Sequence, residues 1–197
     1  MNRPRVVLVG PMGAGKTTVG RLLASQWGME LRDTDQDVES AAGRTVSEIF
    51  VDDGEARFRE LEREAVAAAL AAHPGVLALG GGAVLDPRTQ EALAEHRVVF
   101  LQVGLSDAVK RVGLGTARPL LLGNVRSQIK ALLDARLPVY QAVATLIVAT
   151  DGKTPGEVAE EVRRAVESSE AVESSEAAES SKAESAEPES VEGGRDD

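Results

Sequence analysis

The sequence predicts one α/β domain, a parallel sheet flanked by helices, followed by an acidic tail. Short apolar runs alternate with segments of helical pattern over residues 1–166, an order typical of parallel sheets. The first apolar run ends in a glycine-rich motif from which a helix starts. Residues 167–197 are rich in Glu, Ser and Ala and contain no aromatic side chain. We therefore expect a folded domain over 1–166 and a disordered tail over 167–197.

The first predicted strand and helix flank the glycine-rich motif. Val6–Val9 is an uninterrupted apolar run of the length expected for a buried strand. Thr17–Trp27 carries apolar residues on one side and is followed by Gly28, a residue typical of helix ends. These two elements place the motif in the turn between a strand and a helix.

The second and third strands enclose a long helical region. Glu30–Asp33 is a short strand, and a helical pattern then extends over Asp35–Ala72 with breaks at Gly43 and Gly54. Val76–Leu79 is a third apolar run, directly followed by three glycines. Ligand sites in such folds lie beyond the carboxyl ends of the strands, so three turns become candidate sites.

The remaining elements continue the alternation. Asp86 precedes Pro87 at the start of a helix to Glu95, as an N-cap and a first helical position respectively. Pro138 lies within the expected long helix Val125–Tyr140 and should kink it or end its first half. The other expected elements are strands Arg97–Val103 and Leu146–Val148, helices Ser106–Val112, Val125–Tyr140 and Thr154–Ser168, and a loop over Gly113–Gly123.

Charge and composition exclude several classes of protein. Residues 167–197 hold eleven acidic and two basic side chains, a net charge of −9, which leaves residues 1–166 with 20 basic and 21 acidic side chains. The nearly neutral domain lacks the basic footprint of a nucleic-acid-binding protein. The chain has no cysteine, which excludes disulfides and thiol chemistry. No apolar run is long enough for a signal peptide or a membrane span, so we expect a cytoplasmic protein.

The acidic tail repeats a short unit. VESSEA occurs at Val166–Ala171 and again at Val172–Ala177, and AESSKA follows at Ala178–Ala183. These residues cannot bury enough surface to offset the entropy of ordering. The tail is therefore either a solvated segment without function or a segment that binds an unknown partner.

Residues Gly10–Thr17 read GPMGAGKT, which matches the P-loop pattern G-x-x-x-x-G-K-[ST]. Glycines let backbone N–H groups turn toward phosphate oxygens, and the helix that follows adds its positive N-terminal dipole. Lys16 would reach the β- and γ-phosphates, and the Thr17 hydroxyl would bind Mg²⁺. A chance glycine-rich turn is the alternative, but the strand before and the helix after favour a nucleoside triphosphate site.

Two carboxylates follow the second strand. Alternation in an extended chain sends Asp33 and Asp35 to one side, with Thr34 opposite. Next to a P-loop, one carboxylate can hold Mg²⁺ through water, and the other can accept a proton from an attacking hydroxyl. The alternative is that Asp35 only caps the next helix.

Other segments add candidate contacts. The three glycines at 80–82 would expose backbone amides to a ligand. The loop over Gly113–Gly123 contains Arg118 between glycines, which suggests a lid that closes over phosphate or, alternatively, a plain surface loop. Arg59 and Glu62 lie on one helix face and would ordinarily form a surface ion pair. Phe58 is expected in the core or in a pocket wall.

The ordered motifs resemble those of the shikimate kinases over roughly residues 5 to 165. They are GPMGAGKTT, LRDTD, the GRTVSEIF–DGE–FRELE stretch, LALGGGAV, RPLL and ARLPVY. The resemblance implies transfer of the ATP γ-phosphate to the 3-hydroxyl of shikimate, with Mg²⁺. It also implies a five-stranded parallel sheet of order 2-3-1-4-5 in a P-loop kinase fold, and we expect a monomer.

The resemblance also implies roles for residues that match the family motifs. Catalytic roles fall to Asp35, Lys16 and Arg118, and magnesium binding to Thr17 directly and to Asp33 through water. Glu62 would position Arg59. ATP would contact Gly13, Ala14, Gly15, Lys16, Thr17, Thr18, Arg111, Arg118 and Lys153. Shikimate would contact Asp35, Arg59, Gly80, Gly81, Gly82 and Arg136. The chain departs from the family at Lys153, where many members carry arginine, and at the lid, where an asparagine is common near Gly115.

Two other function classes remain at this point. A P-loop kinase for another hydroxy acid, such as gluconate, would also need a cationic group for its substrate. A protein that uses nucleotide only as a switch would use the acidic tail for docking. The Asp33–Asp35 pair and Arg118 favour a phosphotransferase over such a switch.

Overall fold

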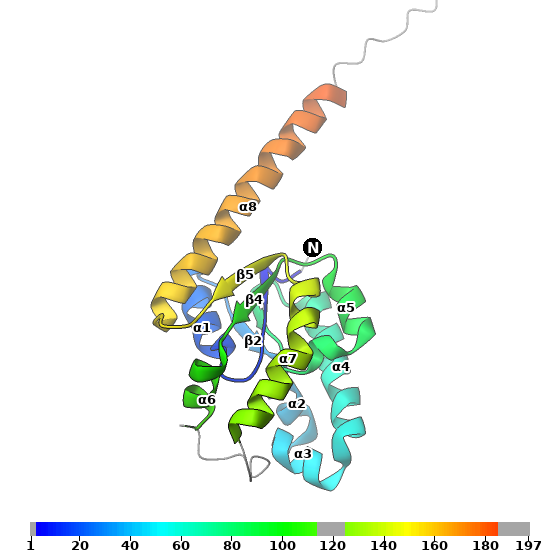
Figure 1. Ribbon diagram of the computed structural model, residues 1–197. Helices are drawn as coiled ribbons and strands as arrows, with labels where there is room; N and C mark the ends of the chain where they lie inside the picture. The colour runs from blue at the N-terminus through cyan, green and yellow to red at the C-terminus, as the bar shows by residue number, and fades with distance from the viewer. Residues whose placement is uncertain (1–2, 114–124, 185–197) are drawn as a thin grey trace, which may run out of the picture. The chain divides into compact units, whose positions relative to one another are not determined.

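The computed structural model describes residues 3–113 and 125–184, and its centre is a five-stranded parallel sheet (Figure 1). The strand order is β2-β3-β1-β4-β5, which confirms the order implied by the family resemblance. The strands are β1 (Val6–Val9), β2 (Leu31–Asp33), β3 (Val76–Ala78), β4 (Val98–Gln102) and β5 (Leu146–Ala149).

Helices connect the strands in the predicted alternation. Gly43 ends one helix and Gly54 starts another, so the predicted breaks are confirmed. Asp86 caps the helix that starts at Pro87, also as predicted. The helices are α1 (Lys16–Trp27), α2 (Thr34–Ala42), α3 (Val46–Asp52), α4 (Gly54–Ala72), the 3₁₀ turn η1 (Ala83–Leu85), α5 (Pro87–Leu93), α6 (Leu105–Gly113), α7 (Val125–Val143) and α8 (Pro155–Glu184).

Strand register brings three loops to one edge of the sheet. Val76 of β3 lies beside Val6 of β1 and Leu31 of β2, and all of these pairs are parallel. The carboxyl ends of β1, β2 and β3 therefore lie next to one another. The P-loop, the start of α2 and the glycines after β3 leave the sheet from this edge, as the sequence predicts for a ligand site.

Helices cover both faces of the sheet (Figure 1), and apolar side chains fill the space between the layers. One face packs side chains from β1, β3 and β4 against α4, α5 and α7, with members Val7, Leu77, Phe100, Val66, Leu93 and Tyr140. On the other face α1 approaches so closely that a Cβ on Gly20 would lie 2.8 Å from Leu31 and 3.3 Å from Leu8. Burial of each large apolar side chain contributes roughly 1.5–3 kcal/mol, so the sheet is a firm base for the loops.

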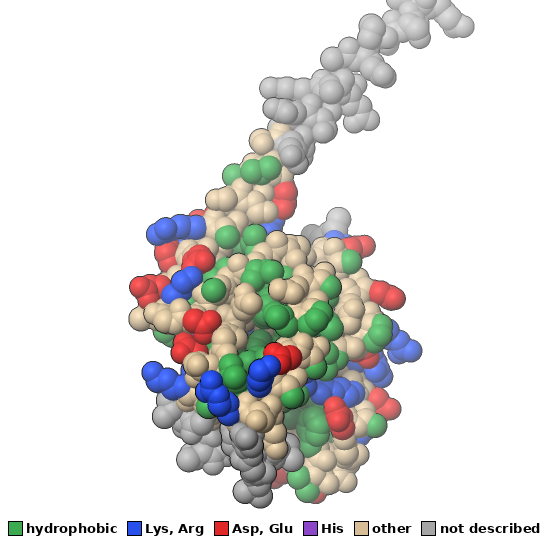
Figure 2. Space-filling view, viewed as in Figure 1, with side chains coloured by type: hydrophobic (Ala, Val, Ile, Leu, Met, Phe, Trp, Pro, Cys, Tyr) green, Lys and Arg blue, Asp and Glu red, His purple; other side chains and the backbone are tan. Residues whose placement is uncertain are grey.

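The surface carries charges of both signs. Acidic and basic side chains are mixed over the face of the molecule in Figure 2, in keeping with the nearly neutral composition of residues 1–166. Among the described residues, no helix is both long and apolar enough to cross a membrane.

Two helices differ from expectation. α7 runs through Pro138 to Val143, so the proline does not end it, although its missing N–H leaves the residue 134 carbonyl without that partner. α8 continues to Glu184, whereas the sequence predicts a helix end at Ser168. Ala and Glu favour helix, and the Ser174 hydroxyl bonds the Glu170 carbonyl at 2.7 Å within it. A disordered tail is thus not confirmed, and residues 185–197 lie outside the described part of the chain.

The chain divides into two compact units, residues 1–163 and 164–197. The first contains the sheet and every residue of the candidate site. The second, taken by itself, is the helical continuation of α8 and the residues after it, and in it residues 171–175 are exposed. The division into a kinase domain over 1–166 and a tail over 167–197 stays a prediction.

Candidate functional site

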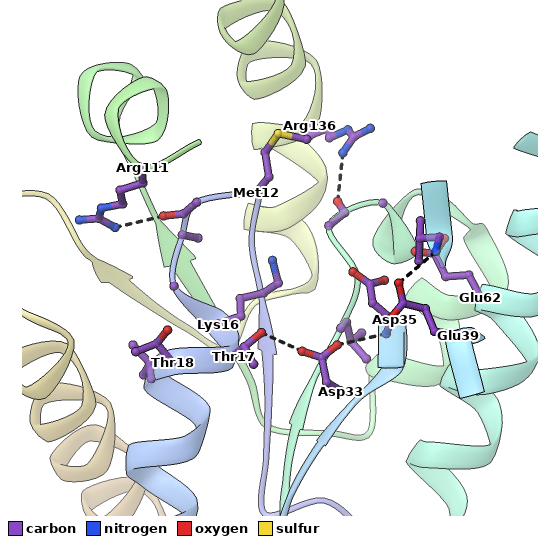
Figure 3. A pocket seen from close by; sticks show the side chains of 18 of the residues that line it. Met12, Lys16, Thr17, Thr18, Asp33, Asp35, Glu39, Glu62, Arg111 and Arg136 are labelled. Atoms are coloured by element: carbon purple, nitrogen blue, oxygen red, sulfur yellow. Dashed lines mark hydrogen bonds between the residues drawn. The ribbon is translucent and has the colours of Figure 1, made fainter. Parts of the chain in front are cut away.

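A cavity of about 1040 Å³ opens over the carboxyl edge of the sheet. Its lining comes from the P-loop, the start of α2, the α3–α4 region, the glycines after β3, α6, α7 and the segment after β5 (Figure 3). Most predicted site residues line it, namely Gly13, Ala14, Gly15, Lys16, Thr17, Thr18, Asp33, Asp35, Arg59, Gly81, Gly82, Arg111, Arg136 and Lys153. The sequence therefore predicts the place of the cavity and about half of the residues that line it.

The P-loop has the backbone of an anion site. Gly13 and Gly15 take φ values of 77° and 93°, which residues other than glycine adopt only at a cost in conformational energy. Helix α1 starts at Lys16 with no side-chain cap and no acidic residue in its first turn. Its N-terminal dipole is therefore available to a phosphate.

Lys16 lies over its own loop. Its Nζ donates to the Gly10 carbonyl at 2.7 Å and to the Pro11 carbonyl at 3.1 Å. The ammonium is half-buried and points into the cavity (Figure 3). Carbonyl oxygens are weaker partners for an ammonium than phosphate oxygens, so the present contacts hold the charge in place for an anionic ligand.

Thr17 and Asp33 meet across the P-loop and β2. The Thr17 hydroxyl donates to Asp33 Oδ2 at 2.7 Å (Figure 3). The other oxygen of Asp33 accepts the backbone N–H of Asp35 at 3.1 Å and caps α2. The alternative that Asp35 caps this helix is therefore wrong. Because α2 starts at Thr34, helical geometry rather than strand alternation brings Asp33 and Asp35 to the same cavity.

The glycine turn is shaped by its neighbours. A Cβ on Gly80 would lie closer than 3.0 Å to carboxylate oxygens of both Asp35 and Glu62, and a Cβ on Gly82 would collide with the Arg59 guanidinium. A Cβ on Gly81 would meet nothing nearer than 3.6 Å. A side chain at Gly80 or Gly82 would thus displace the ends of Asp35, Glu62 or Arg59 from their present positions.

Thr34 fixes the start of that turn. It is fully buried, and its hydroxyl accepts the Gly80 N–H at 3.0 Å. Gly80 is predicted to contact substrate, but its N–H is engaged by Thr34, and only Gly81 and Gly82 of this turn line the cavity. The middle residue of the Asp33-Thr34-Asp35 sequence therefore joins the ends of β2 and β3.

Arg59 is held by two carboxylates. Its Nη1 donates to Glu62 at 2.5 Å, while Nε and Nη2 both donate to Glu55 at 3.3 and 3.1 Å. These bonds use three of the five guanidinium N–H groups, and two others remain for a ligand. The Glu62 residue is only 3% exposed, so an ordinary surface ion pair, the alternative from sequence, is wrong.

Burial and the close contact between Glu62 and Arg59 shift the pKa of both groups. Burial raises the pKa of Glu62, although the neighbouring Arg59 acts in the opposite direction. The contacts with Glu62 and Glu55 outweigh burial and raise the pKa of Arg59. The guanidinium thus stays charged, with its orientation set by the helix that carries all three residues.

A second guanidinium comes from the opposite side. Arg136 of α7 donates from Nη1 to the Gly81 carbonyl at 3.2 Å, and its side chain reaches the cavity (Figure 3). The sequence separates it from Arg59 by 77 positions, and the fold places both in one lining. The cavity therefore offers two cations near two carboxylates, which suits an acidic ligand with hydroxyl groups.

An apolar wall lies beside the charged groups. The Phe50 and Phe58 rings pack with centroids 4.6 Å apart, and both residues line the cavity. Phe58 is buried in a small core with Val38 and Ile49, which confirms its predicted place. Sequence reasoning missed several lining residues, among them Met12 of the P-loop, Glu39 of α2, Val46, Ser47 and Phe50 of α3, and Glu55 of α4.

The far end of the cavity is braced by Arg111. Its Nη1 donates to the Gly13 carbonyl at 3.2 Å and to the Thr150 hydroxyl at 3.1 Å. Its Nη2 donates to Asp107 at 3.1 Å and to the Thr150 carbonyl at 2.8 Å. Lys153 lines the same end and pairs with Glu161 at 2.5 Å. Arg111 therefore joins the P-loop to the segment after β5.

The lid arginine and the magnesium ion are the remaining predicted parts of the site. Arg118, expected in a lid, lies outside the described residues. Within 3–113 and 125–184, no group of three or more Asp, Glu, His or Cys side chains is arranged to hold a metal ion. Magnesium in nucleotide sites is commonly held by one or two protein oxygens together with phosphates and water, and the Thr17–Asp33 pair supplies such oxygens.

Comparison with known proteins points to one family. A family model described as shikimate kinase matches residues 12–167. A shikimate kinase of Thermobifida fusca is 61% identical over 83% of this chain and 95% of its own length. One from Rhodococcus jostii is 46% identical over 81% of this chain and 95% of its own length.

Solved structures agree. A shikimate kinase from Acinetobacter baumannii in complex with shikimate has a TM-score of 0.80 and 34% identity, over 85% of this chain and 94% of the other. A gluconokinase from Sinorhizobium meliloti has a TM-score of 0.51 at 20% identity, over 82% of this chain and 90% of the other, which shows a shared fold alone.

Proposed function

This chain belongs to the shikimate kinase family, and on that premise we propose that it transfers the γ-phosphate of ATP to the 3-hydroxyl of shikimate. The products are shikimate 3-phosphate and ADP. The observation that carries the proposal is one cavity in which a P-loop, the Asp33–Asp35 pair and two arginines meet. The structure of a relative in complex with shikimate supports the choice of acceptor.

The P-loop is proposed to hold the ATP phosphates. Backbone N–H groups of Gly13 to Thr18 and the start of α1 would surround the phosphate oxygens. Lys16 would exchange the carbonyls of Gly10 and Pro11 for the β- and γ-phosphates. Arg111 and Lys153 would lie near the base at the far end of the cavity.

Thr17 and Asp33 fit a magnesium ion. Their oxygens are already within 2.7 Å of one another, and a hydroxyl with a carboxylate is a suitable oxygen donor set. We propose that Thr17 binds the ion directly and that Asp33 does so through water. Bound magnesium would offset negative charge on the phosphates.

Asp35 is proposed as the base. Its carboxylate would accept the proton of the 3-hydroxyl while that oxygen bonds to the γ-phosphorus, and the bond from this phosphorus to the ADP oxygen breaks. Asp35 lines the same cavity as Lys16, Arg59 and Arg136. This shared lining supports the proposal that Asp35 acts on the hydroxyl nearest the phosphates.

Arg59 and Arg136 are proposed to bind the carboxylate of shikimate. Planar guanidinium groups can donate parallel hydrogen bonds to both oxygens of a carboxylate. The backbone of Gly81 and Gly82 would approach the ring, since both residues line the cavity. Arg118 is proposed to act on the transferred phosphate.

We also propose that the enzyme acts as a cytoplasmic monomer without a nucleic-acid or membrane partner. All proposed contacts from described residues come from one chain, so the site needs no second copy. Light scattering during size-exclusion chromatography tests the oligomeric state.

Turnover in a coupled assay tests the reaction, with shikimate, gluconate and water offered as acceptors in separate experiments. We expect ADP formation to depend on shikimate, with gluconate and water near background. Equal or faster turnover with gluconate would contradict the proposed acceptor. Shikimate-independent ATP hydrolysis as the main activity would contradict the kinase assignment.

Asp35→Asn tests the base. We expect kcat to fall by about 10²–10⁴-fold, because proton transfer by a positioned base contributes this much, while the Kd of ATP changes little. Single-turnover rates and nucleotide titration separate the two quantities. A collapse of ATP affinity with a normal rate for bound substrate would make Asp35 a nucleotide or metal residue instead.

A further inference from the structure

Tyr140 is a buried polar residue that the proposed reaction does not use. It is 1% exposed and lies on α7, where its ring stacks on Phe100 with centroids 5.0 Å apart and planes 16° apart. Tyr140 is absent from the cavity lining. A phenylalanine would fill this space equally well, so the hydroxyl calls for a separate explanation.

The hydroxyl binds the turn that faces the substrate. Tyr140 donates to the Gly81 carbonyl at 2.5 Å. Burial raises the pKa of Tyr140, so the group remains a protonated donor. The same carbonyl accepts Arg136 Nη1 at 3.2 Å, and a carbonyl oxygen has two lone pairs, one for each donor. Tyr140 and Arg136 are four residues apart on one helix, so both side chains reach the same atom.

Gly81 needs an external restraint. It lies between two other glycines, and a peptide flanked by glycine has wide rotational freedom. Thr34 holds the N–H of Gly80, while the Gly81 carbonyl depends on the two side chains from α7. Phe100 is a residue of β4, so the hydroxyl of Tyr140 connects the turn to the central sheet.

We propose that Tyr140 is a positioning residue for the acceptor carboxylate: its hydroxyl fixes the Gly81 carbonyl, and this carbonyl orients the Arg136 guanidinium. The inference rests on the proposed function, in which Arg136 binds that carboxylate. A guanidinium that is already oriented loses less freedom when the ligand binds, which increases affinity. ATP binds at the other end of the cavity and does not depend on this contact.

Tyr140→Phe removes the hydroxyl and keeps the ring stack. We expect the Kd of shikimate to rise about three- to tenfold, the usual effect of one neutral hydrogen bond. The Kd of ATP and the kcat at saturating shikimate should stay within about twofold. A purely structural role would not separate shikimate affinity from the other two quantities.

A double-mutant cycle tests the route through Arg136. Calorimetry measures the Kd of shikimate for wild type, Tyr140→Phe, Arg136→Met and the double variant. If Tyr140 acts through Arg136, its substitution has little further effect once Arg136 is replaced. Additive effects of the two substitutions would overturn the proposal, and so would an unchanged shikimate Kd in Tyr140→Phe.

Two controls complete the test. Thr145→Val removes another hydroxyl that bonds a strand backbone, the N–H and carbonyl of Val98 at 3.0 Å each, and should leave the Kd of shikimate unchanged. Replacement of Tyr140 by p-aminophenylalanine restores a donor on the ring and should recover affinity. Failure of this rescue, with a folded protein by circular dichroism, would overturn the proposal. Wild type that does not bind shikimate would instead refute the proposed function itself.

Discussion

The two ends of the cavity are built in different ways. The proposed nucleotide end is formed mainly by the consecutive residues Gly10–Thr17, where Gly10, Gly13 and Gly15 take positive φ angles. The proposed acceptor end is formed by α2, α4, the turn after β3 and α7. Its lining residues are spread through the sequence from Asp35 to Arg136. The geometry of the nucleotide end therefore depends on one loop, whereas the geometry of the acceptor end depends on sheet register and helix packing. Substitutions at the two ends should therefore have separable effects.

Lys16→Met should produce the largest effect and confine it to the nucleotide end. We expect kcat to fall by at least about 10²–10³-fold, because the variant loses a charged donor to the transferred phosphate. The Kd of shikimate without nucleotide should not change, since the Lys16 ammonium donates to the P-loop carbonyls of Gly10 and Pro11. A coupled assay and calorimetry measure these quantities.

Circular dichroism is the control for that variant. Wild-type turnover with an unchanged spectrum would remove Lys16 from the phosphate site. A large loss of shikimate affinity would show that the two ends are not separable.

Gly82→Ala should produce the next largest effect and confine it to the acceptor end. The added methyl group would collide with the Arg59 guanidinium, so we expect the Kd of shikimate to rise about ten- to a hundredfold, as for loss of a charged hydrogen bond. Gly156→Ala is the matched control, because its Cβ would meet nothing nearer than 4.0 Å and Gly156 is absent from the cavity lining. Calorimetry compares both variants with ATP and with shikimate. Equal effects of the two substitutions would refute the steric account.

Glu62→Gln tests the support of Arg59 through pH. Burial raises the pKa of Glu62, so this carboxylate takes up a proton at a higher pH than an ordinary carboxyl does. Protonation weakens its contact with Arg59, so the kcat/KM of the wild type for shikimate should begin to fall at that higher pH as the solution is acidified. Glu62→Gln should lower kcat/KM several-fold and remove this acid limb. Glu55→Gln, a change at an exposed carboxylate, should have little effect.

The same shift has a consequence for stability with a defined sign. A carboxyl whose pKa is raised by folding binds protons more readily in the folded state, so its stabilising contribution is present at acid pH and is lost as pH rises through the folded pKa. The stability of wild type relative to Glu62→Gln should therefore decline from acid toward neutral pH. Urea unfolding at several pH values measures this trend, and a rising trend would contradict the assigned direction.

Deletion of residues 169–197 should have the smallest effect, since the segment belongs to neither end. Described side chains at 171–175 are exposed, and no proposed contact lies there. Turnover and melting temperature should stay close to those of the full chain. A melting temperature lowered by several degrees would show that the segment contributes to the folded domain.

Much of the fold could be predicted because its signals are local. The apolar run Val6–Val9, the P-loop and the glycine breaks at 43 and 54 mark elements by their own residues. The end of α8 was mispredicted, because the alanines and glutamates of the repeat favour helix as well as solvation. The sequence left a kink or a helix end open at Pro138, and α7 continues to Val143, since packing of that helix outweighs one missing backbone bond.

The candidate site was predictable only in part. Spacing alone could not distinguish an exposed Glu62 from a buried one, because burial depends on how α4 packs against the glycine turn. The interpretation of Asp35 as the cap of α2 was wrong, because α2 begins at Thr34, one residue earlier than expected, and is capped by Asp33. The roles of Thr34 and Tyr140 depend on contacts across 46 and 59 positions, which no local pattern contains.

The brace formed by Arg111 has a consequence for how a nucleobase is recognised. Four of its five N–H groups are directed at the protein itself, so the edge of the guanidinium is almost fully occupied. What it offers to a base is its flat face, and stacking on a face does not distinguish the hydrogen-bonding groups of adenine from those of guanine. We therefore expect this arginine to support purine nucleotides in general, and any preference for adenine to arise from the backbone around it.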